Sequence, residues 1–256
     1  RRGAGGDDIS IKRAHLGGGG DHRMWKRFFR FLKIPVLILA VAFVGYELWV
    51  AACVAWWVKY DPRTSAFMED RLEILQEKNP RTELRQRWVP YSKISSYLKR
   101  AVIASEDATF TRHDGFDWTA LEKALNKNLK KGRIVAGGST LSQQLAKNLF
   151  LSGQRTVWRK AQEAYITVLI EWLMDKRRIL EIYLNIIEWG DGVFGAEAAA
   201  RHYFGVSAAA LDPQQAARLA AMIPNPRYYD RRRQTGYLQY RTRVILARMP
   251  GAVIPR

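Results

Sequence analysis

The sequence predicts a mainly α-helical domain joined to one membrane-spanning helix. Two observations carry this expectation. Apolar residues recur at helical spacing through most of 98–249, where alternating runs typical of strands are scarce, and one continuous apolar run occupies 34–58. A chain of 256 residues has room for one domain of about 200 residues and not for a second large one. The expected organisation is a largely disordered basic tail over 1–33, a transmembrane helix over 34–58 and a globular domain over 59–256.

The chain is strongly basic, with a formal net charge of +18 and a pI near 10.2. Such a charge indicates an anionic partner: nucleic acid, an anionic membrane surface or a phosphorylated substrate. The apolar run argues against nucleic acid. The single cysteine, Cys53, excludes an intramolecular disulfide framework and a cysteine-rich metal site.

The segment 34–58 exceeds the roughly 20 apolar residues needed to cross a bilayer, and Glu47 is its one charged residue. Residues 1–33 carry nine Lys or Arg against three Asp, so we expect this tail to stay in the cytoplasm and the domain to lie outside. Within the tail, 1–23 include four consecutive glycines and few apolar residues, which predicts disorder.

Two other interpretations of the apolar run are open. A cleavable signal peptide has a shorter apolar region, of about 7 to 15 residues. The sequence VAAC at 50–53 resembles a lipoprotein cleavage site, but the apolar run continues beyond Cys53 as far as Trp57. We therefore expect an uncleaved transmembrane helix.

Eight helices are expected in the domain from apolar spacing and from helix start and stop signals. Turns are expected where Gly, Pro and Asn gather, at 131–138, 190–192 and 224–229, and 78–97 is expected to be a loop. The predicted helices cover 98–108, 118–129, 140–149, 157–174, 176–187, 193–203, 213–223 and 236–249.

The most specific segment is GGSTLSQQLAKNLFL at 137–151. Ser139 or Thr140 can cap a helix whose leucines, at four-residue spacing, form a stripe suited to burial. Thr140, Gln144 and Lys147 fall on another face, which places a hydroxyl, an amide and an ammonium in one column. The alternative interpretation is a capped surface helix with a solvated lysine.

A pair of carboxylates, Glu106 and Asp107, lies in RAVIASEDATFTRHDGFDW at 100–118. A carboxylate at the end of a buried helix can be partly desolvated, which raises its pKa toward the range of a general base. The alternative is an ordinary acidic pair at a helix end beside a surface histidine, His113.

Two further polar segments follow. RKAQE at 159–163 sets Arg159 and Glu163 one helical turn apart, a spacing that is also common in exposed ion pairs. DKRRILEIYLN at 175–185 reads as an amphipathic helix with Glu181 and Asn185 one turn apart. Its expected core residues are Ile179, Leu180, Tyr183 and Leu184.

In this order and at these separations, the four segments closely resemble the glycosyltransferase domain of bacterial peptidoglycan polymerases, the family that includes the first domain of bifunctional penicillin-binding proteins. The resemblance covers about 97–249, and one membrane span without a further domain is similar to its monofunctional members. Gln215 departs from the Glu usual in that family, and Ser142 from its frequent Thr.

The resemblance implies a lysozyme-like glycosyltransferase fold and a processive reaction between lipid II and a glycan chain growing on undecaprenyl diphosphate. By the same resemblance, Glu106 takes the proton of the acceptor's 4-hydroxyl as that oxygen attacks the donor's anomeric carbon. Direct displacement inverts an α-linked donor to a β-1,4 bond. Diphosphate is a good leaving group that needs charge stabilisation, which guanidinium and ammonium groups supply.

The other expected site residues also follow from the resemblance. Lys147, Arg159 and Lys160 would stabilise the diphosphate. Glu163, the second catalytic residue, would orient these cations or ligate a divalent metal, Mg²⁺ or Mn²⁺, and no organic cofactor is expected. The remaining substrate-binding residues are Asp107, Phe110, His113, Thr140, Gln144 and Asn148, of which the first three shape the pocket of Glu106.

The expected location is the bacterial cytoplasmic (inner) membrane, with a single pass, a cytoplasmic N-terminus and a catalytic domain in the periplasm. The expected partners are lipid II, the growing glycan chain, the membrane and proteins of cell-wall synthesis or division, without nucleic acid.

Two alternative functions remain. A lysozyme-like hydrolase or lytic transglycosylase would share the fold but lack cations beside the base, and a non-catalytic basic module would bind membrane alone. Ser96 and Lys99 satisfy the SxxK pattern of penicillin-binding transpeptidases, but no KTG sequence follows, so penicillin reactivity is not expected.

Overall fold

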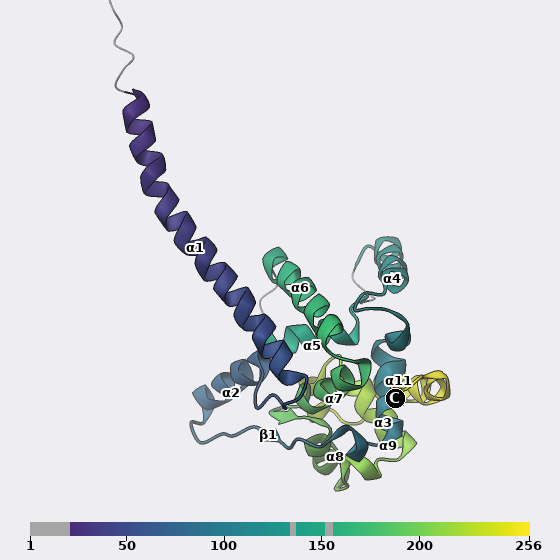
Figure 1. The fold of residues 1–256 in the computed structure, drawn as a ribbon. Coiled ribbons are helices and arrows are strands. Elements are labelled where there is room, and N and C mark those ends of the chain that lie inside the picture. The colour runs from purple at the N-terminus through teal and green to yellow at the C-terminus, as the bar shows by residue number, and fades with distance from the viewer. Residues whose placement is uncertain (1–20, 134–136, 152–155) are drawn as a thin grey trace, which may run out of the picture. The chain divides into compact units, whose positions relative to one another are not determined.

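The computed structural model describes residues 21–133, 137–151 and 156–256, and for 21–32 the backbone alone. The chain divides into two units, Arg1–Trp49 and Val50–Arg256, which we describe separately. The described part of the first unit belongs to one helix, α1 (Asp21–Trp57), whose last residues belong to the second unit (Figure 1).

Within the described residues, α1 contains the one segment long and apolar enough to cross a membrane, Lys33–Trp57, with 25 residues and a mean hydropathy of 2.2. It agrees with the predicted span to within one residue. The helix begins at Asp21, so residues 21–33 of the predicted tail are helical. No Gly or Pro interrupts that stretch, and the apolar helix extends through it. Residues 1–20, where the rest of the predicted tail falls, lie outside the described residues.

The second unit is mainly helical, as predicted. Side-chain oxygens of Ser, Thr or Asp accept an N–H of the first turn at eight of its helices, which explains where those helices begin. Its helices are α2 (Ala66–Lys78), α3 (Ser96–Glu106), α4 (Trp118–Lys131), α5 (Leu141–Phe150), α6 (Val157–Leu173), α7 (Lys176–Ile186), α8 (Ala196–Phe204), α9 (Pro213–Met222), α10 (Pro226–Arg231) and α11 (Gly236–Arg248).

Two of these helices differ from the sequence expectation. The range of α2 received no prediction, and α10 replaces part of the turn expected at 224–229, because Pro226 stands at the first helical position, where its missing N–H costs nothing. Gln215, the departure from the family pattern, closes a capping box with Asp212 at the start of α9. Glutamine serves there as glutamate would.

A small sheet also departs from the expectation. Its strands β1 (Arg85–Gln86), β3 (Val193–Phe194) and β2 (Glu188–Gly190) lie in that order, with β3 parallel to β1 and antiparallel to β2. The helix expected from residue 193 therefore begins at Ala196. Gly195 separates strand from helix at φ 80°, and a Cβ there would lie 2.6 Å from the carbonyl oxygen of Asn185.

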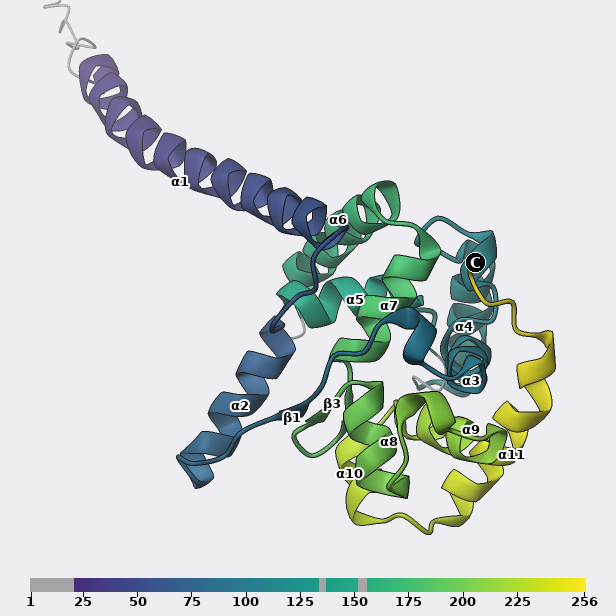
Figure 2. The same cartoon turned by 60° about the horizontal axis from the view of Figure 1, so that its bottom comes forward.

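The core of this unit centres on α7, which lies in the middle of the fold in both views (Figures 1 and 2). Burial of the apolar face of α7 is complete, and Leu141, Leu145 and Leu149 of α5 are buried as their spacing predicts. Helices α3, α9 and α11 pack together on one side, and α5 packs against α6 and α7. The C-terminus of α3 and the polar face of α5 are thereby brought together.

Candidate functional site

Glu106 ends α3 as a partly buried carboxylate with two hydrogen-bond donors. Ser105 Oγ donates to its Oε1 over 3.0 Å, and Gln144 Nε2 on α5 donates to its Oε2 over 3.1 Å. Burial raises the pKa of Glu106, while these two hydrogen bonds and the charges of Arg241 and Lys147 oppose the rise. A raised pKa suits a group that must take up a proton during turnover.

The two donors, Gln144 and Ser105, are themselves held by hydrogen bonds from residues that the sequence did not indicate as part of the site. Tyr183 on α7 is fully buried, and its hydroxyl donates to Gln144 Oε1 over 2.9 Å. Arg241 on α11 reaches Ser105 Oγ over 3.4 Å. Apolar spacing placed Tyr183 in the core, which is correct, but spacing says nothing about its hydroxyl. Arg241 lies 136 residues from Ser105, so no local pattern could connect them.

Asp107 is buried and joins α3 to the start of α5. Its Oδ2 accepts the backbone N–H of Leu141 over 3.0 Å, and His113 Nε2 lies 2.9 Å from its Oδ1. A carboxylate is favoured at a helix N-terminus, where N–H groups lack partners. Asp107 therefore fixes the helix that carries Gln144.

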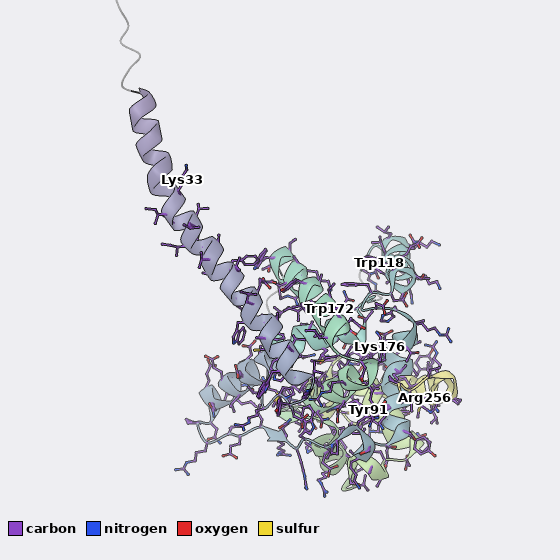
Figure 3. All side chains as sticks on the ribbon, viewed as in Figure 1. Lys33, Tyr91, Trp118, Trp172, Lys176 and Arg256 are labelled. Carbon is purple, nitrogen blue, oxygen red and sulfur yellow. The ribbon has the colours of Figure 1, made fainter. Side chains whose placement is uncertain are left out.

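A cavity of about 680 Å³ opens beside Glu106. Asp107, His113 and Thr140 also line it, together with Phe116 and Trp118, whose rings stack with centroids 5.6 Å apart. Trp118 begins α4 and is largely exposed (Figure 3). The lining of the cavity thus combines the carboxylate of Glu106 with two aromatic side chains, the mixture of polar and aromatic groups typical of ligand sites.

Cationic side chains gather around Glu163 on α6. Glu163 is 3% exposed, its Oε2 lies 3.1 Å from Arg159, and its Oε1 pairs with Lys160. Lys147 on α5 is partly buried and has no ion-pair or hydrogen-bond partner for its ammonium within the described residues. Burial lowers the pKa of Lys147, Arg159 and Lys160 lower it further, and Glu163 and Glu106 oppose them. The cluster therefore holds a cation available to an anionic ligand.

Three predicted substrate-binding residues are committed to internal contacts. Thr140 Oγ1 donates to the carbonyl of Gly115 over 2.6 Å and caps α5. Asn148 donates to the backbone oxygen of Gln144 over 2.8 Å, and Phe110 is fully buried beneath Lys176. Phe110 and Asn148 therefore support the site from inside the fold, whereas Thr140 also lines the cavity.

The surroundings of Glu163 do not fit a metal ion. Both of its oxygens face cationic nitrogens, and within the described residues no group of three or more His, Cys, Asp or Glu is placed to hold a metal. A divalent cation prefers several oxygen ligands without competing cations.

Replacing Glu163 by Gln tests its role as the counter-ion of this cluster. We expect the melting temperature of the full chain in detergent to fall, because Arg159, Lys160 and Lys147 would repel one another without the buried carboxylate. A loss of about 2 kcal/mol corresponds to about 4 to 8 °C for a chain of this size. Activity should fall as well. Exposed Glu83 replaced by Gln is the control, and equal melting temperatures for the two variants would contradict the assignment.

Comparison with known proteins matches most of the chain to the family that its sequence motifs resemble. The family model described as Transglycosylase matches residues 72–250. A protein from Nitrosospira multiformis named biosynthetic peptidoglycan transglycosylase is 59% identical over 230 residues, covering 89% of this chain and 100% of that protein. Proteins of the same name are 56% identical over 230 residues in Janthinobacterium sp. (90% and 98% covered) and 59% identical over 220 residues in Laribacter hongkongensis (86% and 96% covered).

Proposed function

Because the chain belongs to the family of biosynthetic peptidoglycan transglycosylases, enzymes that polymerise glycan strands, we propose that Glu106 is the general base of an inverting glycosyl transfer to lipid II. One observation carries this assignment: a carboxylate with a raised pKa lines a cavity and lies within electrostatic reach of Lys147 on α5, which has no ion-pair partner among the described residues. This geometry supports the pairing of a proton acceptor with a nearby cation that could stabilise a departing anion.

In the proposed step, the 4-hydroxyl oxygen of the acceptor sugar attacks the anomeric carbon of the donor chain. The hydroxyl proton passes to Glu106 as the new C–O bond forms. The bond from the anomeric carbon to the diphosphate breaks, and its electron pair leaves with undecaprenyl diphosphate. Attack from the face opposite the leaving group converts an α-linked donor to a β-1,4 linkage. Glu106 then returns its proton to solvent.

The cation cluster would stabilise the charge that develops on the leaving diphosphate. Lys147 is the cation most available to the diphosphate, since Arg159 and Lys160 are both paired with Glu163. Preorganised cations in a partly dry site contribute much more than they would in water. This feature favours synthesis over cleavage, because a glycosidase uses a second carboxyl group to protonate or replace a leaving alkoxide. Both oxygens of Glu163 are instead engaged by cations.

We further propose that α1 anchors the enzyme in the bacterial inner membrane. Its segment Lys33–Trp57 has the length and hydropathy of a span, and the excess of Lys and Arg before it favours a cytoplasmic N-terminus. The catalytic domain would then lie in the periplasm, where it would take lipid II and the growing chain and meet proteins of cell-wall synthesis or division.

Incubation of the full chain in detergent with labelled lipid II tests the proposed function. We expect long glycan strands, resolved by gel electrophoresis, that a lysozyme digests. Shortening of isolated cell-wall sacculi without strand synthesis would instead support the lytic alternative. Absence of both activities would favour a non-catalytic module that only binds membrane.

Tyr183 is expected to position the general base through Gln144. Its hydroxyl donates to Gln144 Oε1, which leaves Nε2 to donate to Glu106. In Tyr183→Phe the amide can turn its oxygen toward the carboxyl group, which favours the protonated form and raises the pKa of Glu106 further. We expect kcat/KM to fall about 3- to 10-fold near neutral pH, as for the loss of one hydrogen bond.

The pH profile distinguishes this effect from a packing defect. A higher pKa leaves less ionised base at low pH, so the loss in Tyr183→Phe should be greatest in acid and should shrink as pH rises. Tyr91→Phe is the matched control, because the Tyr91 hydroxyl is also buried but donates to Pro255 O over 3.0 Å. A loss in Tyr183→Phe that is equal at every pH would contradict the positioning role.

A further inference from the structure

A second cavity, of about 580 Å³, lies between α2 and α10. It shares no lining residue with the cavity beside Glu106. In both views α2 lies on the opposite side of this unit from α4, which borders the first cavity (Figures 1 and 2). The lining is strongly cationic and comprises Arg71, Lys78, Asn225, Arg227, Tyr228, Arg231 and Arg232.

The base of this cavity is built into the fold. Arg71 is 6% exposed, and it pairs with Asp191 and lies 3.5 Å from Glu188. Arg227 Nε lies 3.2 Å from the other oxygen of Glu188, and Arg231 lies 3.2 Å from Asp191. The two carboxylates therefore join α2 to α10 and hold three guanidinium groups in one place.

The positive charge of the cavity exceeds what these carboxylates balance. The lining contains five cationic side chains, three of which pair with the two carboxylates Glu188 and Asp191, so the formal charge of the cluster is +3. Within the described residues, Lys78 and Arg232 have no ion-pair partner, and Arg232 instead lies over the ring of Tyr228 and reaches its hydroxyl over 3.2 Å. The buried Nε of Arg71 already faces Glu188 Oε1, so the cations free for a ligand among the described residues are the exposed Lys78 and Arg232. Such an arrangement is one that an anionic ligand would complete.

We propose that this cavity binds carboxylate groups of the peptides carried by the peptidoglycan strand. The inference rests on the proposed function, which supplies that strand. Guanidinium forks match the planar geometry of a carboxylate. Tyr228 is the one aromatic residue of the lining and aliphatic side chains are missing from it, whereas a surface that binds lipid combines basic with apolar residues. A concave polar cavity suits a discrete hydrophilic anion. A strand held there would stay on the enzyme between successive additions of lipid II.

The test measures binding of a soluble disaccharide-peptide fragment of peptidoglycan to the full chain in detergent, by isothermal titration calorimetry. The variant Lys78→Glu/Arg232→Glu changes two exposed residues of the cavity and leaves the pairs of Glu188 and Asp191 intact. We expect its Kd to be at least about tenfold higher than that of the unmodified chain. Lys93→Glu/Arg243→Glu removes the same charge from exposed positions outside the cavity and should bind normally.

The other measurements identify the ligand. The same fragment with its carboxylates amidated should bind at least about tenfold more weakly than the free acid. Equal binding of both fragments, or an equal loss in both double variants, would overturn the proposal. Binding of inorganic phosphate or of anionic lipid vesicles without binding of the fragment would also overturn it. Glu106→Gln should bind the fragment normally while making no strands, so failure here is distinguishable from failure of the proposed function.

Discussion

Replacing Glu106 by Gln is expected to reduce polymerisation of lipid II by about 10² to 10⁴-fold, the usual contribution of a positioned general base. Glutamine keeps the size of the side chain and can still bond to Ser105 and Gln144, but it cannot take up the proton of the attacking hydroxyl. The measurement is the rate of strand formation by the full chain from labelled lipid II.

Folding of this variant should be unaffected or slightly improved. Burial raises the pKa of Glu106, so the ionised form is less favourable in the folded state than in the unfolded chain at pH values above that pKa. Glutamine removes that cost, and the melting temperature should not fall. Binding of a diphosphate lipid should also persist, since the cations are untouched. Turnover close to that of the unmodified chain would remove Glu106 from the role of base.

Replacing Lys147 by Ala should lower kcat/KM by about 10² to 10³-fold, the usual effect of removing one group that stabilises charge in a transition state. Lys147 is the cation of its cluster that has no carboxylate partner within the described residues, whereas Arg159 and Lys160 pair with Glu163. Replacement by Ala therefore removes the positive charge of Lys147 and leaves no buried carboxylate without its partner. Steady-state kinetics with lipid II are the measurement.

The pH dependence of the unmodified enzyme provides a second test of Lys147. Burial lowers its pKa, so activity that needs its charge should decline at a pH below the ordinary range of lysine. Lys93→Ala, which removes an exposed lysine outside the site, is the control and should match the unmodified chain. Near-normal kcat/KM in Lys147→Ala would contradict its assignment to the diphosphate.

Most helices could be predicted from the sequence because each depends on local chemistry. Seven of the eight predicted helices appear with ends shifted by at most two residues, since caps such as Thr140 and Asp117 act within one turn. The exception is the helix expected from residue 193. Val193 and Phe194 join a strand there because β1, about 100 residues earlier, offers a hydrogen-bonding edge that local spacing cannot reveal.

The candidate site could be predicted only in part. The motifs indicated Glu106, Gln144 and Lys147, and the structure brings the first two into hydrogen-bond contact. Thr140, Gln144 and Lys147, expected on a common face, have three different roles in the structure. Thr140 caps the helix, Gln144 donates to Glu106, and Lys147 has no ion-pair partner among the described residues. A shared helix face determines direction but not partners, which come from other elements.

The sequence by itself determined the helical class, the apolar span and the residue types of the site, because periodicity, hydropathy and capping act over one or two turns of chain. The tertiary structure decided which of those residues are available for chemistry. Packing of α3, α5, α7 and α11 buries Glu106 enough to raise its pKa and supplies Tyr183 and Arg241 to hold its donors. Desolvation and hydrogen bonding over such separations depend on the folded chain as a whole, since neither exists until these helices meet.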